Sequence, residues 1–323
     1  MSGRELDAAG ITDPALRASY EACRRLNASH GRTYYLATLL LPAWKRPYVH
    51  ALYGFARYAD EIVDDLASTL TDAEKADWLV GWGEQFVADV AAGGSEHPIS
   101  RAVVDTVRRW DIPMTYVEAF LASMRMDLTV TDYATYDDLM TYVYGSAAVI
   151  GLEMVPVLEP LVPREVADPY AADLGIAFQM SNFIRDVGED LQRGRVYLPL
   201  EELAAFGVDR EHLQRGVVDA RVRRALAFQV ARTRETYRVA AHGVRLLHPT
   251  SRPCIETALA LYGGILDEVE KADYQVLDRR VSVGSARRAA VAGPGLVRAA
   301  LARRKTPNQG EVGRSTRPEE SRS

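Results

Sequence analysis

The chain has 323 residues, of which 48% are hydrophobic and 26% are charged, and its net charge of -5 at pH 7 gives no general attraction to nucleic acid. Its two cysteines, Cys23 and Cys254, are too few for a disulfide framework and favour a reducing compartment. It contains neither a signal-peptide core nor an uninterrupted run of about 18 apolar residues, so we expect a cytoplasmic protein without a membrane span.

Apolar residues recur with the period of a helix along nearly the whole chain, and strand-like alternation is scarce. Capping signals at 71–74 and 135–138 support two of the helix starts. The pattern predicts one all-α domain over 1–305, followed by a disordered polar tail over 306–323. The predicted helices span 14–28, 46–68, 72–91, 99–110, 114–129, 136–158, 164–192, 217–247, 252–278 and 285–304.

The predicted helix 46–68 carries a polar stripe on an otherwise apolar surface. Tyr53, Arg57, Asp60 and Asp64 fall at i, i+4, i+7 and i+11, so they share one face. A mostly buried helix retains ionised carboxylates only if another group satisfies them. One pair of aspartates at this spacing is nevertheless weak evidence, because it usually belongs to a solvated face.

The predicted helix 164–192 repeats the arrangement. Gln179, Asn182, Asp186 and Asp190 fall at i, i+3, i+7 and i+11, again among apolar neighbours. Two such stripes are much harder to obtain by chance than one. We therefore interpret them as the two sides of one binding site.

The residue types of the stripes indicate the ligand. Their donors are all oxygen atoms, with no His or Cys beside them, which favours Mg²⁺, with Mn²⁺ as an alternative, over calcium or zinc. Magnesium usually takes one or two carboxylates and completes its shell with water and phosphate oxygens. Arg57 and Arg185 add fork-shaped donors, so the site suits a diphosphate.

The segments around both stripes resemble the two signatures of the squalene/phytoene synthase family. The first match is 53–64, and the second is 179–199, which contains RDVGED followed by RGRVYLP. Segment 30–35 resembles the family's N-terminal segment that folds over the site, and the likeness covers about 20–285. Further matches are 40–42, 124–128, 142–147, Tyr262, 265–266 and 281–283.

The resemblance implies an all-α isoprenoid synthase fold, a single helical bundle around a deep central cavity. It implies a head-to-head condensation of two allylic prenyl diphosphates through a cyclopropylcarbinyl diphosphate, which then ionises and rearranges to the linear product. A dry apolar tunnel would protect the cations from water. The resemblance also implies a metal ion that bridges protein ligands to diphosphate. These ligands are Asp60, Asp64, Asn182, Asp186 and Asp190.

The resemblance also implies roles for residues outside the metal set. Tyr142, Arg57 and Tyr34 are expected to be catalytic, Tyr142 by assisting proton removal and by offering its ring face to the cation. A plain core tyrosine is the alternative for Tyr142. The expected substrate-binding residues are His30, Arg32, Tyr53, Gln179, Arg185, Arg195 and Tyr262. An exposed helix end is the alternative for the first two, and ordering of the loop after the second stripe is the alternative for Arg195.

Two glycines, Gly145 and Gly151, lie inside the predicted helix 136–158. Each costs about 1 kcal/mol there relative to alanine, so each needs a reason. Room for a substrate chain is one explanation, and close packing of helices is the simpler one.

We expect geranylgeranyl diphosphate as the substrate and phytoene, formed through prephytoene diphosphate in carotenoid biosynthesis, as the product. No nicotinamide-binding glycine signature and no C-terminal membrane helix are found, which argues against a reducing squalene synthase, so no NADPH is expected. One alternative is a C30 enzyme that converts farnesyl diphosphate to dehydrosqualene, presqualene diphosphate or hydroxysqualene. Another is a non-catalytic relative that binds prenyl chains.

Segment 279–305 contains eight basic residues and no acidic residue. A basic amphipathic segment can bind an anionic membrane surface, which would suit an enzyme with a very apolar product. We therefore expect peripheral contact with the inner face of the membrane as an addition to the cytoplasmic location, and downstream carotenoid enzymes as further partners. A solvated final helix is the alternative.

Overall fold

A computed structural model describes residues 2–64 and 69–305, apart from the side chains of Ser2, Arg32 and Asp64. Regular structure in these residues is helical apart from two isolated β-bridges, so the predicted all-α class is confirmed. The predicted tail 306–323 and the last four residues of the predicted helix 46–68 lie outside the described residues.

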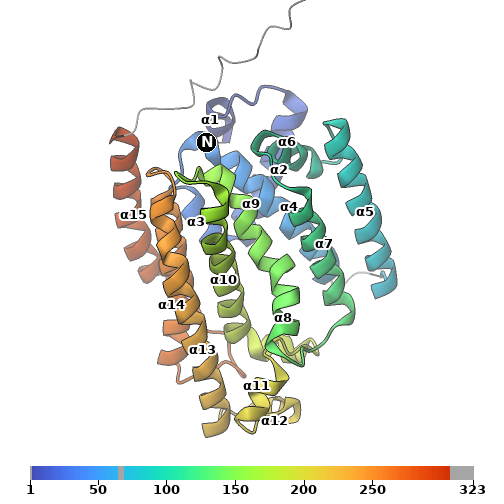
Figure 1. The fold of residues 1–323 in the computed structure, drawn as a ribbon, viewed down its shortest axis with the longest axis vertical. Helices are drawn as coiled ribbons and strands as arrows, with labels where there is room; N and C mark the ends of the chain where they lie inside the picture. Colours follow the sequence, from blue (N-terminus) through green and yellow to red (C-terminus); the bar gives the residue numbers. More distant parts are fainter. Residues whose placement is uncertain (1, 65–68, 306–323) are drawn as a thin grey trace, which may run out of the picture.

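The elements follow one another as a bundle (Figure 1). The first half comprises α1 (Ser2–Ala8), α2 (Pro14–His30), α3 (Arg32–Thr38), the 3₁₀ turn η1 (Ala43–Lys45), α4 (Arg46–Asp64), α5 (Asp72–Ala92), α6 (Ser100–Trp110), α7 (Met114–Thr129) and α8 (Tyr136–Val143). The second half comprises the π-helical η2 (Tyr144–Ala148), α9 (Val149–Leu158), α10 (Arg164–Gln192), α11 (Leu200–Ala205), α12 (Arg210–Gln214), α13 (Ala220–Ala240), the 3₁₀ segment η3 (Ala241–Leu246), α14 (Arg252–Lys271) and α15 (Ser285–Lys305).

Long amphipathic helices match their predicted ranges, and α7 and α10 match them at both ends. The prediction missed α1 and α3, which have seven residues each and are too short to establish a helical period. The predicted helix 252–278 was too long. It ends at Lys271, because Asp273 and Tyr274 adopt left-handed φ values of 51° and 60°. The predicted helix 217–247 likewise changes to 3₁₀ geometry after α13.

Two clusters of buried apolar side chains hold the bundle together. Phe55 of α4 and Phe86 of α5 belong to the first, which fills the space among α2, α4, α5, α6 and α7. Phe183 of α10 and Leu266 of α14 belong to the second, which fills the space among α8, α10, α13 and α14. The two predicted acidic helices therefore belong to different clusters, and Figure 1 shows α10 near the middle of the bundle.

The helix glycines allow close packing in the centre of the bundle. A Cβ on Gly145 would overlap the carbonyl oxygen of Ala119 in α7, and one on Gly151 would overlap that of Ala171 in α10. A Cβ on Gly175 of α10 would likewise overlap the carbonyl oxygen of Ala147 in η2. Close helix packing therefore explains these positions.

One helix among the described residues, Tyr136–Leu158, is long and apolar enough to cross a membrane by length and composition, with a window hydropathy of 1.4. The sequence criterion of an uninterrupted apolar run missed it, because Glu153 interrupts that run. Since 61% of this window is buried inside the bundle, the helix has the position of a core helix, and one such helix is weak evidence for a membrane span.

Glu153 gives a testable pH effect. It is 3% exposed, and burial raises the pKa of its carboxyl from 4.5 to about 8. The unfolded chain loses this proton near pH 4.5 and the folded chain only near pH 8, so the contribution of this carboxyl to stability is fully present below pH 4.5 and is lost as the pH rises through that window. Glu153→Gln, which resembles the protonated form, should therefore raise the free energy of unfolding by about 3 kcal/mol at pH 7 and leave it unchanged below pH 4.

Urea unfolding at pH 4 and pH 7 measures this difference. Glu118→Gln on the exposed face of α7 is the matched control, with a small effect expected at both pH values. An equal gain at both pH values for Glu153→Gln would contradict the titration argument.

Candidate active site

A cavity of about 360 Å³ lies between α4, α10 and the helices around them. Along α10 its lining runs from Ala167 to Asn182, and fifteen residues of helix span about 22 Å. One end is polar and the other is apolar, so the cavity is a channel with a polar mouth. The polar end is lined by Asn27, Tyr53, Arg57, Asp60, Gln179 and Asn182, and the apolar end by Leu158, Ala167, Val244, Leu247 and Cys254.

The first stripe lies on α4 at the mouth. Arg57 donates from Nη1 to Asp60 Oδ2 at 2.7 Å and from Nε to Glu61 Oε1 at 3.1 Å. Its guanidinium therefore offsets the charge of both carboxylates, and the predicted catalytic arginine lies against a predicted metal ligand. The side chain of Asp64 lies outside the described part of the structure.

The second stripe lies on α10. Asp186 is 16% exposed and accepts from Arg185 Nε at 2.7 Å, while Arg280 Nε, from the segment between α14 and α15, approaches its Oδ1 at 2.9 Å. One turn further on, burial and the nearby Asp186 charge raise the pKa of Asp190 to about 7. Asp186 is thus neutralised by two arginines, whereas the charges of Arg193 and Arg195 near Asp190 only partly offset the effect of burial on its pKa.

These residues fit a hard divalent cation. Where side chains are described, no three acidic, His or Cys groups lie close enough together to hold a metal ion. The donors are nevertheless all oxygens, and Asp60 and Asn182, from the two stripes, line the same mouth. The raised pKa of Asp190 indicates a carboxylate that a nearby cation would stabilise in its ionised form.

Aromatic rings form the wall just inside the mouth. Tyr34 of α3 lies 4.8 Å from Tyr262 of α14 and 6.1 Å from Tyr53 of α4, measured between ring centroids. Phe178 of α10 stacks on Tyr262 at 4.3 Å. Tyr34, Tyr53 and Phe178 line the channel, so aromatic rings lie beside the space behind the polar mouth.

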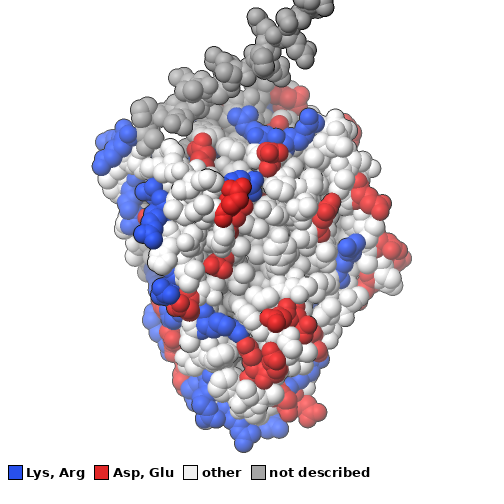
Figure 2. Space-filling model, in the orientation of Figure 1, with Lys and Arg blue, Asp and Glu red and all other residues white. Residues whose placement is uncertain are grey.

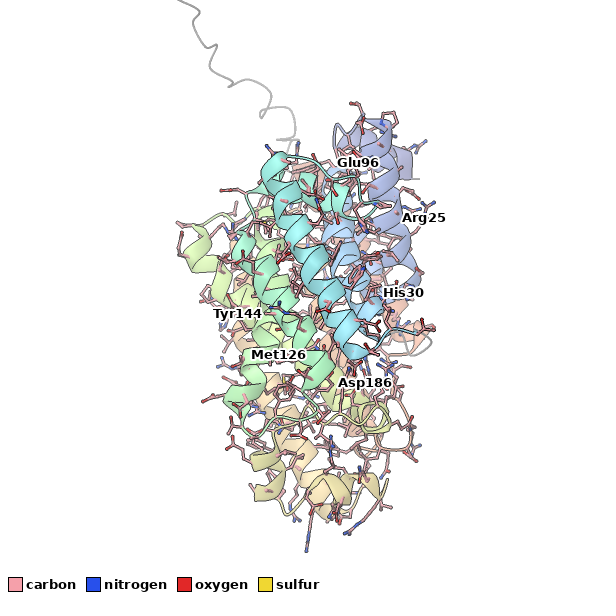
Figure 3. The ribbon with its side chains drawn as sticks, turned by 90° about the vertical axis from the view of Figure 1, so that its right-hand side faces the viewer. Arg25, His30, Glu96, Met126, Tyr144 and Asp186 are labelled. Carbon is pink, nitrogen blue, oxygen red and sulfur yellow. The ribbon has the colours of Figure 1, made fainter. Side chains whose placement is uncertain are left out.

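Tyr142 also lines the channel, and it is 3% exposed. Its hydroxyl donates to Asp127 Oδ2 at 2.7 Å, and the Tyr197 hydroxyl donates to the other carboxylate oxygen at 3.0 Å. Burial, with the Asp127 charge as a further cause, holds the pKa of Tyr142 well above its ordinary value, so its phenol is protonated. Tyr144, two residues further on, is 48% exposed on the outer surface (Figure 3).

A model of the squalene/phytoene synthase family matches residues 27–287 of this chain. The chain belongs to the squalene/phytoene synthase family. It is thus a prenyltransferase of the head-to-head type, and prenyl diphosphates are the substrates that this family implies.

The chain is similar to several curated family members. A phytoene synthase from Arthrospira platensis is 38% identical over 283 residues, which cover 84% of this chain and 90% of that protein. A 15-cis-phytoene synthase from Synechococcus elongatus is 37% identical over 279 residues, which cover 83% and 89% respectively.

Solved structures of similar fold confirm the predicted isoprenoid synthase fold. A dehydrosqualene synthase in complex with a ligand superposes with a TM-score of 0.79 at 24% identity and covers 87% of this chain and 96% of that one. A squalene synthase from Alicyclobacillus acidocaldarius superposes with a TM-score of 0.74 at 25% identity and covers 83% and 98% respectively.

Other predicted site residues of this family member lie around the mouth rather than in it. His30 is the last residue of α2, 42% exposed, and its Nε2 lies 3.3 Å from Glu61 Oε1 (Figure 3). The side chain of Arg32 lies outside the described part of the structure. Arg195 donates to the Asp127 carbonyl at 2.8 Å and lies 3.4 Å from the Tyr197 hydroxyl, contacts that order the loop after α10.

Sequence reasoning missed two residues of this site. Asp127 is 9% exposed and accepts from both Tyr142 and Tyr197. An aspartate on the apolar face of the predicted helix 114–129 was a signal that could have revealed it. Arg280, which binds Asp186 from 94 residues away, gave no local signal, because it was one of many arginines in a basic segment.

Proposed function

We propose that this family member condenses two molecules of geranylgeranyl diphosphate to phytoene through prephytoene diphosphate, in carotenoid biosynthesis. The observation that carries the proposal is an apolar channel, about 22 Å long along α10, whose mouth is lined by Asp60 of the first stripe and by Gln179 and Asn182 of the second. The curated relatives at 37–38% identity, both phytoene synthases, support the longer substrate. Conversion to phytoene needs no reductant, so NADPH is not part of the proposal.

A divalent cation, Mg²⁺ or Mn²⁺, is proposed at the mouth. The residues that would hold it are Asp60, Asp64, Asn182, Asp186 and Asp190. When bound, it would supply the positive charge that stabilises departing diphosphate. Arg57 adds a second source of charge, since its guanidinium lines the mouth and offers several donors to phosphate oxygens.

The remaining proposed roles belong to the channel. Its apolar lining excludes water, which would otherwise capture an allylic cation. Tyr34 and Tyr53 offer ring faces to that cation near the mouth, and Gln179 offers an amide there. Tyr142 lines the channel, where its phenol oxygen can take up a proton while its own proton passes along the hydrogen bond to Asp127.

Product analysis tests the proposal. The purified chain is incubated with MgCl₂ and either geranylgeranyl or farnesyl diphosphate, and the products are identified by mass. We expect phytoene from the first substrate and loss of turnover with EDTA. A C30 product alone would replace the phytoene assignment with dehydrosqualene, presqualene diphosphate or hydroxysqualene synthesis. No product from either substrate would favour a prenyl-binding role without catalysis.

We also propose peripheral contact with an anionic membrane through the outer face of α15. The first arginines of the basic segment 279–305 form ion pairs within the protein. Arg280 binds Asp186, and Arg287 donates to Glu268 at 2.9 Å. Further along, Leu296, Val297 and Leu301 are 51%, 60% and 49% exposed. Figure 2 shows Lys and Arg gathered along the edge of the molecule where α14 and α15 lie.

Replacing Leu296, Val297 and Leu301 with Glu should abolish binding to vesicles that contain phosphatidylglycerol, because it removes the exposed apolar side chains and adds like charge. Cosedimentation measures the bound fraction. Phe228→Glu, at a 42% exposed position on α13, is the control and should leave binding intact. Unchanged binding of the triple variant would remove the membrane proposal and leave a solvated helix. The cytoplasmic location and contact with downstream carotenoid enzymes remain proposals of the same kind.

A further inference from the structure

An ionic cluster, formed by a fully buried ammonium group and a carboxylate whose side chain is 32% exposed, lies behind the apolar end of the channel. Lys45 of η1 is fully buried, and its Nζ lies 2.5 Å from Glu159 Oε2 and donates to Ser251 Oγ at 2.9 Å. Ser251 is fully buried as well. The ammonium group thus joins the start of α4 to two connections that are distant in sequence.

Main-chain contacts join the same two connections directly. His248 N donates to Glu159 O at 2.8 Å, and Leu161 N donates to Leu246 O at 2.7 Å. Pro160 and Leu247 form an isolated antiparallel bridge. The link between α9 and α10 is therefore fastened to the link between η3 and α14, with Lys45 as the third point of attachment.

The residues that close the channel adjoin this cluster in sequence. Leu158 precedes Glu159, Leu247 lies in the bridge, and the amide of Cys254 donates to Ser251 O at 3.2 Å. We propose that the bridge from Lys45 to Glu159 and Ser251 fixes the closed end of the channel and thereby limits the length of the prenyl chain that this enzyme accepts. The inference rests on the proposed prenyl synthase function, and Lys45 acts in it as a positioning residue.

Two observations favour a positioning role over simple space filling. A buried ammonium group carries a large desolvation cost that an apolar side chain of similar volume would avoid, while its charge-assisted hydrogen bonds have defined directions. Glu159 also holds a left-handed backbone, with φ of 56°, which is unfavourable for a residue other than glycine. A residue with a carboxylate thus occupies a position where the backbone conformation alone would favour glycine.

Lys45→Met tests the proposal, because methionine keeps most of the volume and removes the charge. The purified variant is assayed with farnesyl, geranylgeranyl and farnesylgeranyl diphosphates in competition. We expect the relative turnover of the longest substrate to rise at least about tenfold, the low end of the discrimination that one methylene confers in an apolar pocket. Glu159→Gln, a milder change, should shift the preference in the same direction and keeps the test available if Lys45→Met does not fold.

Arg232→Met is the matched control. Arg232 of α13 donates to Glu202 at 2.8 Å in an ion pair whose side chains are 23% and 16% exposed, and neither residue lines the channel. This variant should lose thermal stability and keep the chain-length preference of the parent. A Lys45→Met enzyme with lowered thermal stability and unchanged preference would overturn the inference.

A binding series separates this inference from the proposed function. Dodecyl, hexadecyl and eicosyl diphosphates are compared as ligands by calorimetry, which needs no turnover. A longer optimum chain in Lys45→Met than in the parent supports the inference even if the parent makes a C30 product or no product. An identical optimum in both proteins opposes it, whatever the product assay gives.

Discussion

Asp186→Ala should lower the turnover of geranylgeranyl diphosphate by about 10³-fold or more, the largest effect that we expect from one side chain. Asp186 is a proposed ligand of the cation at the mouth. The positive charge that this cation supplies stabilises the transition state by several kcal/mol, and a loss of about 4 kcal/mol lowers the rate about 10³-fold. Steady-state product formation at saturating MgCl₂ measures the loss. Circular dichroism of the variant checks that the helices persist.

Glu189→Ala is the control for this variant. Glu189 lies on the same helix, is 44% exposed and shares Arg280 with Asp186 through an ion pair of 3.4 Å, yet it belongs to neither stripe. We expect its loss to lower turnover less than about tenfold, as for a weak surface ion pair. A rate for Asp186→Ala within tenfold of the parent would remove Asp186 from the metal site.

Tyr142→Phe should lower turnover by about 10²-fold or more, within the range that a positioned acid or base contributes. The change removes only the hydroxyl, which donates to Asp127 Oδ2 at 2.7 Å, and leaves the ring in the channel wall. Single-turnover kinetics with product identification measures the effect. We also expect a stability loss of about 1–3 kcal/mol, since the buried carboxylate of Asp127 loses one hydrogen-bond donor.

Tyr197→Phe separates the chemical role from the structural one. Tyr197 donates to the other oxygen of Asp127 at 3.0 Å and does not line the channel. It should therefore show a similar loss of stability and less than about a tenfold loss of turnover. If both variants lost turnover equally, Tyr142 would be a core tyrosine that supports Asp127, the alternative that the sequence left open.

The sequence predicted those features that depend on regular local patterns. α7 and α10 had long apolar periods, so both of their ends were predicted correctly. The stripe of α10 placed Gln179 and Asn182 on one face, and both line the channel. Short elements such as α1 and α3 gave no such period, because one or two turns of helix contain too few apolar positions.

Contacts between distant segments could not be predicted. Arg280 binds Asp186 across 94 residues, and no pattern within either segment predicts this pairing. Lys45 and Ser251, which are 206 residues apart, form the buried bridge in the same way. The sequence could therefore identify the acidic helices. It could not show which basic side chains neutralise their carboxylates, nor which residues close the far end of the channel.

The π-helical η2 determines which side of α8 meets the channel. A helix turns about 100° per residue, so deleting one residue within Tyr144–Ala148 would rotate α8 by about that angle relative to α9. The Tyr142 ring would leave the channel wall, although every side chain with a proposed catalytic or binding role would still be present. Single-residue deletions in this segment should therefore be poorly tolerated during divergence, whereas substitutions at exposed Tyr144 should be freely accepted.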